Sequence, residues 1–284
     1  MNTKVSNTEK AVLYVFLTVL AFVALFPILY IAVSSFKSNS EILAHPEWIL
    51  PREFTFDNYI QVWKSDYFDF KRMTFNSLVY TLVCVAINIF VSCGAAYSFV
   101  RGQFRLKKVI FVMFSSIMFV SMGGVTIYPM FDVLNAINLN RGLYGLMVVK
   151  LFTVPIINIY LVKGYIQSLP YEIEEAATID GCSFTSIFFR IIMPLIKPIV
   201  ATVAILSFQG SWNEYLLPTI FTQSVPAQRT LIVGIVALKS SGEAASSWNL
   251  MLAGSTLTVL PILIAYMIGN RYFISGLASG AVKG

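Results

Sequence analysis

Charged side chains, those of Asp, Glu, Lys and Arg, make up only 12% of this sequence, and its acidic residues are densest in one short stretch. The acids of that stretch are Glu172, Glu174, Glu175 and Asp180. Carboxylates this close together can accept charge-assisted hydrogen bonds from basic groups on a partner. No metal site is readable around the single histidine, His45, and no set of acids and bases suggests a catalytic centre. We therefore predict docking rather than catalysis, with no catalytic and no metal-binding residue.

The residues around these acids predict two short helices joined by a bend. Pro170 precedes a run of helix formers, and Gly181 stands where the first helix would stop. A second apolar run, Phe184 to Met193, ends at Pro194. Proline at a start, glycine at a stop and proline just beyond are the usual boundary signals of helices. The bent pair lies between longer apolar segments, so we expect it outside the membrane as a docking element.

The composition indicates a membrane protein. The chain has 284 residues, 57% of them hydrophobic, with a mean hydropathy of +0.75. Soluble domains carry about 25% charged residues, and a spanning helix needs about 20 apolar residues. The runs that reach this length are Ala11–Ser34, Ser77–Val100, Val109–Phe131, Leu143–Val162, Ile199–Phe221 and Trp248–Ile268. The expected fold is an all-α integral membrane protein with six transmembrane helices.

The spans leave no room for a separate soluble domain, so we expect a single transmembrane domain over residues 1–284. We divide it into 1–76, the first span and an external loop; 77–273, a five-span core containing the polar loop 167–195; and 274–284, a cytoplasmic tail. The N-terminal apolar run is longer than the core of a cleavable signal, which has about 7–15 residues, so it is read as an anchor.

The distribution of positive charge predicts the orientation. Basic residues cluster in Arg101–Lys108, between the second and third predicted spans, and short basic segments next to spans stay in the cytoplasm. Both termini are then cytoplasmic. The stretch 170–194, between spans four and five, is cytoplasmic as well. The formal charge of +6 is explained in this way, without a nucleic acid partner.

Two polar residues within the predicted spans are open to two interpretations each. Asn88 belongs to a stripe of small and polar residues at intervals of three or four in the second span, which suits either helix packing or a wet pathway. Lys150 lies in the fourth span, where a buried lysine costs about 3 kcal/mol at the centre. It either snorkels outward or lines a cavity.

The outer half of the fifth span is also polar. Gln209 and Asn213 share one helical face, and Gly210 and Glu214 share the next. An intramembrane carboxylate such as Glu214 is by default a candidate functional residue, although a cap or a pair with a neighbouring span also explains it. The possible translocation path consists of Asn88, Lys150, Gln209, Asn213 and Glu214.

The polar stretch resembles the EAA loop of bacterial ABC-importer permeases, whose pattern is E-A-A-x3-G-x9-I-x-L-P. This sequence reads Glu175-Ala176-Ala177, three residues, Gly181, nine residues, then Ile191-Ile192-Met193-Pro194. Only Met193 in place of leucine departs from the pattern, and the two side chains are similar in volume. The run Trp212–Tyr215 and the terminal 276–284 resemble the carbohydrate-uptake branch, with its MalG-type, binding-protein-dependent subunits. The resemblance covers essentially the whole chain.

The resemblance implies a transport subunit of a bacterial cell membrane that imports a sugar or oligosaccharide by alternating access. Its implied partners are a second permease in a heterodimer, two ATPase subunits, an extracytoplasmic sugar-binding protein and membrane lipid. The residues implied in coupling to the ATPase are Glu174, Glu175, Ala176, Ala177, Asp180 and Gly181, with Gly280 and Lys283 in the tail. The chain contains no phosphate-binding glycine-rich lysine loop, so ATP and magnesium are expected on the partner, and this chain is not an enzyme.

Other classes fit the sequence less well. An ion-coupled secondary carrier would show repeated halves and buried acids, but there is no internal repeat and Glu214 is the only clearly intramembrane acid. A membrane enzyme would need convergent acids or histidines at one membrane face. An ABC permease for a non-sugar solute is the nearest alternative, and the identity of the sugar is not readable.

Overall fold

A computed structural model describes residues 7–64, 68–119, 123–238 and 247–281. These residues form helices, turns and loops, with no β-strand among them, in agreement with the expected all-α class. The chain divides into two compact units, one made of 1–70 and 234–259, the other of 71–233 and 260–284. The predicted division at 76 and 273 remains a prediction.

The first unit begins with α1 (Asn7–Ser34), a helix of 28 residues that contains the first predicted span. Its apolar side chains are exposed on every face, as expected of a helix surrounded by lipid. Pro27 lies inside it without ending it. The short helices α2 (Asn39–Ala44) and α3 (Asp57–Lys64) follow.

A buried asparagine organises the loop after α1. Asn58 Nδ2 donates to the carbonyl oxygens of Ser35 at 2.7 Å and Lys37 at 2.8 Å. Its own Oδ1 accepts from Asn249 Nδ2 at 2.7 Å, near the start of α15 (Trp248–Ala281). The buried Lys37 ammonium donates to the Trp48 carbonyl. These bonds satisfy polar groups that would otherwise be costly to bury.

In the second unit, α4 (Phe70–Arg101) contains the second predicted span as one unbroken helix of 32 residues. The small and polar stripe faces protein: Thr81, Cys84 and Ser92 are fully buried. Ser77 Oγ accepts a hydrogen bond from the amide of Leu231 at 2.7 Å, at the start of α14 (Leu231–Leu238). The packing interpretation therefore holds for most of the stripe.

The third predicted span is not one helix in the described residues. Helix α5 (Lys107–Ile117) ends early, and a 3₁₀ turn η1 (Gly123–Thr126) precedes α6 (Ile127–Ala136). The predicted span over 109–131 is therefore divided, because Gly123-Gly124 disfavours helix, and Pro129 stands in the first turn of α6, where no amide donor is needed.

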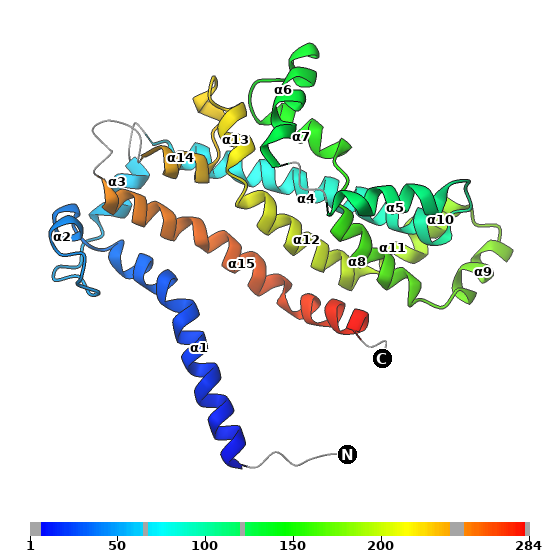
Figure 1. Cartoon of the computed structure of the whole chain (residues 1–284), viewed down its shortest axis with the longest axis horizontal. Helices are drawn as coiled ribbons and strands as arrows, with labels where there is room; N and C mark the ends of the chain where they lie inside the picture. The colour runs from blue at the N-terminus through cyan, green and yellow to red at the C-terminus, as the bar shows by residue number, and fades with distance from the viewer. Residues whose placement is uncertain (1–6, 65–67, 120–122, 239–246, 282–284) are drawn as a thin grey trace. The chain divides into compact units, whose positions relative to one another are not determined.

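The fourth and fifth predicted spans are also divided. Helices α7 (Leu143–Phe152) and α8 (Ile156–Gln167) meet at an angle of 44° beside Pro155. Helix α12 (Lys197–Trp212) ends nine residues before the predicted boundary at Phe221, and α13 (Leu216–Phe221) follows after a break, with a short 3₁₀ turn η3 (Pro226–Gln228) beyond it. Figure 1 shows α8 beside α12 and α13 beside α7. Pro218 explains the break, because its ring is accepted in a first turn but not inside a helix.

Helix α15 (Trp248–Ala281) contains the sixth predicted span. It continues past the predicted end at Ile268, and Gly280 belongs to its helical backbone. Lys283 lies outside the described residues.

Three helices are long and apolar enough to cross a bilayer: α1, α4 and the part Trp248–Gly269 of α15. Two bent pairs would each qualify as a broken span, namely α7 with α8, and Phe184–Leu195 with α12. The described residues therefore supply three to five candidate spans, which indicates a multi-pass membrane protein. The number six remains a prediction.

Candidate functional site

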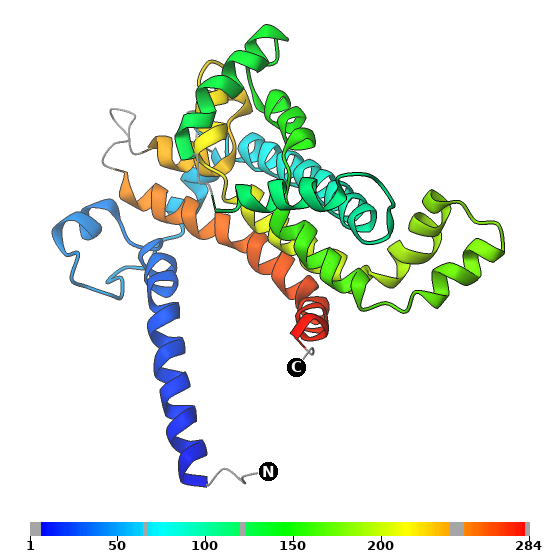
Figure 2. The same ribbon diagram turned by 45° about the vertical axis from the view of Figure 1, so that its right-hand side comes forward.

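The acidic stretch forms the predicted bent pair. Helix α9 (Glu172–Ile179) is followed by α10 (Phe184–Ile187), a π-helical turn η2 (Phe188–Ile192) and α11 (Met193–Leu195). Figures 1 and 2 show α8 leading into α9 and the following helices returning toward α12. The second helix thus runs slightly beyond the predicted stop at Pro194, and the bend into α12 is 80°.

Gly181 ends α9 as expected. Its φ of +81° is in the left-handed region, which costs other residues energy, while a Cβ added there would meet no atom within 4 Å. The Cys182 amide donates to the Ala177 carbonyl and the Gly181 amide to the Thr178 carbonyl, both at 3.0 Å. This pair of bonds is the Schellman helix stop. The backbone conformation, and not a lack of space, therefore requires glycine.

Helix α9 has a buried and an exposed face. Glu174 and Ala177 are buried, at 4% and 6% exposure, whereas Ile179 is 86% exposed. Of the residues predicted to couple to the ATPase, those exposed here are Glu175, Ala176, Asp180 and Gly181. Glu174 was expected to meet a partner together with these residues, and here it faces the interior of its own chain. Adjacent helical residues lie about 100° apart around the axis, so two neighbouring glutamates can serve different faces.

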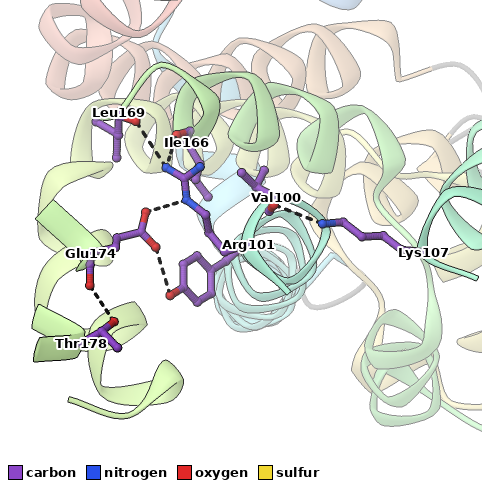
Figure 3. A network of polar contacts seen from close by, with 8 residues as sticks. Val100, Arg101, Lys107, Ile166, Leu169, Glu174 and Thr178 are labelled. Carbon is purple, nitrogen blue, oxygen red and sulfur yellow. Dashed lines mark hydrogen bonds and ion pairs between the residues drawn. The ribbon is translucent and has the colours of Figure 1, made fainter. Parts of the chain in front are cut away.

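The partner of Glu174 is Arg101, the last residue of α4. Its Nε donates to Glu174 Oε1 at 2.6 Å, and Nη2 lies 3.3 Å from the Leu169 carbonyl and 3.5 Å from that of Ile166 (Figure 3). The side chains of the pair are 15% and 6% exposed. A buried ion pair needs such additional hydrogen bonds to offset its desolvation, and the guanidinium fork supplies them.

Neighbouring contacts complete the network. Tyr97, one helical turn before Arg101, donates from its hydroxyl to Glu174 Oε2 at 3.4 Å. The Arg101 guanidinium lies 5.0 Å from the centroid of the Tyr171 ring, a cation–π distance. Lys107 donates to the carbonyls of Val100 at 3.1 Å and Gly102 at 2.9 Å, closing the end of α4 (Figure 3).

An apolar cluster lies beside this network and joins the same elements. Its buried members come from α4, α8, α9, the segment α10 to Ile196 and α12 itself: Cys93, Ala96, Tyr97, Phe99, Ile159, Val162, Ile166, Ala177, Ile187, Phe188, Ile192, Ile196, Ile199 and Val203. Sequence reasoning used Arg101 only to predict orientation and did not consider Tyr97. The sequence does show a basic residue, Arg101, at the end of a predicted helix, and an acid-rich loop elsewhere. It does not show which acid of that loop would pair with Arg101.

A second ion pair lies between Lys150 of α7 and Glu214, in the break after α12. Lys150 Nζ is 3.0 Å from Glu214 Oε2, and the side chains are 20% and 17% exposed. The Tyr80 hydroxyl of α4 donates to the same oxygen at 2.6 Å. Of the alternatives left open for Glu214, the structure shows a pair with a residue of another helix, and that residue is Lys150.

This pair lines a cavity of about 620 Å³. The lining residues are Asn88, Lys150, Val154, Pro155, Ile156, Ile157, Asn158, Leu206, Ser207, Gly210, Ser211 and Glu214. Asn158 Nδ2 donates to Ser207 Oγ at 3.3 Å. The cavity therefore combines amide and hydroxyl groups with one ion pair on an apolar wall.

The structure brings together some of the predicted path residues. Asn88, Lys150 and Glu214 share the cavity, whereas Gln209 and Asn213 are exposed and do not line it. Gly210 and Glu214, which the sequence placed on one face, both line the cavity, and Gln209 and Asn213 belong to the other predicted face.

The sequence of this chain is similar to a known protein family and to individual relatives. Residues 2–278 match the model of the family described as "Binding-protein-dependent transport system inner membrane component". The arabinooligosaccharides transport system permease protein AraQ of Bacillus subtilis is 32% identical over 98% of this chain and 97% of its own length. The inner membrane ABC transporter permease protein YcjP of Escherichia coli is 30% identical over 100% of both chains.

A solved structure has the same fold. It belongs to a bacterial ABC transporter involved in the import of the acidic polysaccharide alginate, and matches with a TM-score of 0.78 and 24% identity over 96% of this chain and 99% of that one. The family model and the two relatives confirm the family predicted from the EAA-like loop. This multi-pass membrane chain belongs to the family of binding-protein-dependent transport system inner membrane components, the permease subunits of ABC transporters.

Proposed function

We propose that this chain is one permease subunit of an ABC importer that moves an oligosaccharide inward, driven by ATP hydrolysis on partner subunits. The observation that carries the proposal is the exposed face of α9, within a loop that matches the permease motif over residues 175–194. Relatives named for the transport of arabinooligosaccharides, galactooligosaccharides and melibiose, raffinose or stachyose support the sugar class.

The proposed topology has six spans with both termini and α9 in the cytoplasm of a bacterial cell. There Glu175 and Asp180 would meet basic groups of an ATPase, and the exposed Ile179 would enter an apolar hollow. Ala176 permits close approach, and Gly181 sets the bend. Gly280 and Lys283 are proposed to reach the ATPase pair as well.

The proposed assembly contains a second permease, two ATPase subunits, an extracytoplasmic sugar-binding protein and surrounding lipid. ATP and magnesium belong to the ATPase subunits, so this chain carries neither cofactor. A solved alginate transporter bound to its pentasaccharide-loaded periplasmic protein, matched here with a TM-score of 0.64, supports this kind of assembly.

The cavity beside Lys150 is proposed to belong to the translocation path, opening alternately to each side. Its lysine is neutralised by Glu214 at 3.0 Å, so the lining offers amides and hydroxyls without a free positive charge. Such a surface suits the hydroxyl groups of an uncharged oligosaccharide better than a sugar acid, which would have to displace Glu214 from Lys150.

The transport proposal is tested by reconstituting the whole importer in lipid vesicles with ATP on the ATPase side. Labelled arabinooligosaccharide, raffinose and alginate pentasaccharide serve as probes, each with its binding protein. We expect ATP-dependent uptake of an uncharged probe. Uptake of alginate pentasaccharide alone would contradict the substrate class, and uptake that is independent of ATP would contradict the transport mechanism.

The docking proposal needs a separate measurement. A photoreactive amino acid at Ile179 should crosslink to an ATPase subunit in the assembled importer, because this side chain is 86% exposed on α9. The matched control is Leu106, which is also exposed but lies on the loop before α5. Crosslinking of Ile179 only to lipid would exclude α9 as the docking surface.

A further inference from the structure

Helix α4 contacts the carboxylates of both ion pairs through two of its own tyrosines. Tyr97 donates to Glu174 of α9, and Tyr80 donates to Glu214 beside the cavity. The two tyrosines are about 25 Å apart along the axis at 1.5 Å per residue. Asn88 of α4, between them in sequence, lines the cavity. One helix therefore connects the proposed docking element to the proposed path.

Helix α4 is suited to act as a rigid link. It is continuous over 32 residues and contains no proline, whereas the α7–α8 and α11–α12 junctions bend by 44° and 80°. A displacement applied to one end of an unbroken helix reaches the other end, but a break can absorb it. The connection between α9 and α4 then depends on the contact at the end of α4.

That contact is made by Arg101. The guanidinium holds Glu174 at 2.6 Å and the carbonyl of Leu169 at 3.3 Å, so one side chain attaches α4 to both α9 and the segment before it. The pair is surrounded by protein, and water competes little for either partner. An ion pair of this kind keeps α9 in a defined rotation, with Glu174 inside and Glu175 outside.

We propose that Arg101 is a positioning residue for energy coupling: its ion pair with Glu174 fixes α9 to α4, so that a displacement of α9 by the ATPase reaches the Lys150–Glu214 pair through α4. This inference rests on the proposed function. It assigns Arg101, Tyr97 and Tyr80 to transmission, and leaves ATPase binding to the exposed face of α9.

The test uses the complete importer in lipid vesicles and measures sugar imported per ATP hydrolysed, together with the amount of ATPase that co-purifies. The probe is the labelled oligosaccharide that the wild-type importer transports. Glu174→Gln should leave the co-purified ATPase unchanged and lower the import per ATP about five- to tenfold, a common size for coupling between sites. Arg101→Lys, which keeps the charge but loses the fork, should give a smaller reduction.

Two controls separate positioning from general destabilisation. Asp132→Asn removes an exposed carboxylate of α6, to which the proposal gives no role, and should leave import per ATP at the wild-type value. Exchanging the charges, with Arg101→Glu and Glu174→Arg together, should restore part of the coupling that either single change removes. A thermal unfolding midpoint for each complex shows whether the fold is retained.

The decisive measurement is a double-mutant cycle between the ends of α4. Tyr80→Phe removes the hydroxyl that contacts Glu214. Substitutions more than about 10 Å apart normally have additive effects. We expect the effects of Tyr80→Phe and Glu174→Gln on import per ATP to be non-additive, because both interrupt one connection.

Additive effects, or wild-type import per ATP in Glu174→Gln, would overturn the inference. Either result, with a wild-type importer that transports in an ATP-dependent manner, would leave the proposed function intact. Loss of ATP-dependent import in the wild-type complex would instead remove the proposed function itself.

Discussion

The second unit has two ion pairs of largely covered side chains, which have the same parts but different surroundings. In one pair Glu174 binds Arg101, and in the other Glu214 binds Lys150. Each carboxylate also accepts a hydrogen bond from a tyrosine of α4. Arg101 also donates to backbone carbonyls and adjoins an apolar cluster, whereas Lys150 borders a cavity of about 620 Å³. A pair enclosed by protein holds elements together, and a pair beside a cavity can exchange its partner for a ligand.

The largest expected effect on stability is at Arg101. Arg101→Met should lower the free energy of unfolding by about 3–5 kcal/mol, because it leaves the Glu174 carboxylate buried without its cation. Thermal or denaturant unfolding of the purified chain in lipid or detergent measures this loss. A loss below about 1 kcal/mol, the range of exposed pairs, would mean that water reaches the pair.

At the Lys150–Glu214 pair, removing the cation should lower the free energy of unfolding by less than at Arg101. Lys150→Met leaves Glu214 with Tyr80 and with the cavity, so we expect a loss of about 1–3 kcal/mol. Adding Glu214→Gln removes the orphaned charge, and the double variant should unfold closer to the wild type. If Lys150→Met is as damaging as Arg101→Met, the two pairs do not differ as their surroundings suggest.

A substitution at Gly181 tests the turn that ends α9, and it leaves the Arg101–Glu174 ion pair unchanged. Gly181→Val should cost about 1–2 kcal/mol, because a residue with a side chain is strained at a φ of +81°. Gly94, which lies in α4 and whose added Cβ would also meet no atom within 4 Å, is the control: Gly94→Ala should be neutral or stabilising. Equal unfolding midpoints for both variants would show that the left-handed turn is not needed.

The smallest expected effect on stability is at Glu175. Glu175→Gln should change the free energy of unfolding by less than about 0.5 kcal/mol, as surface substitutions usually do, while it weakens ATPase co-purification. Glu174→Gln should lower the free energy of unfolding and leave ATPase co-purification unchanged. Measuring both quantities for both variants asks whether neighbouring carboxylates have separate roles, and identical profiles would contradict the separation seen in α9.

The sequence predicted the helices whose local signals were consistent. The apolar runs of α1, α4 and α15 and the stop at Gly181 all appear in the structure. The third and fifth predicted spans are each divided into shorter helices, and apolar content alone does not show where Gly123 or Pro218 redirects the backbone. The coupling and path roles of the site residues remain predictions.

The sequence alone determined the family and the all-α membrane class, because motif spacing and long apolar runs are properties of the chain itself. Only the tertiary structure decided that Glu174 pairs with Arg101 while Glu175 faces outward, and that Lys150 meets Glu214. These pairings join residues far apart in the chain, and they depend on which helix packs against which face. That choice comes from packing around the whole core, so no local pattern of residues encodes it.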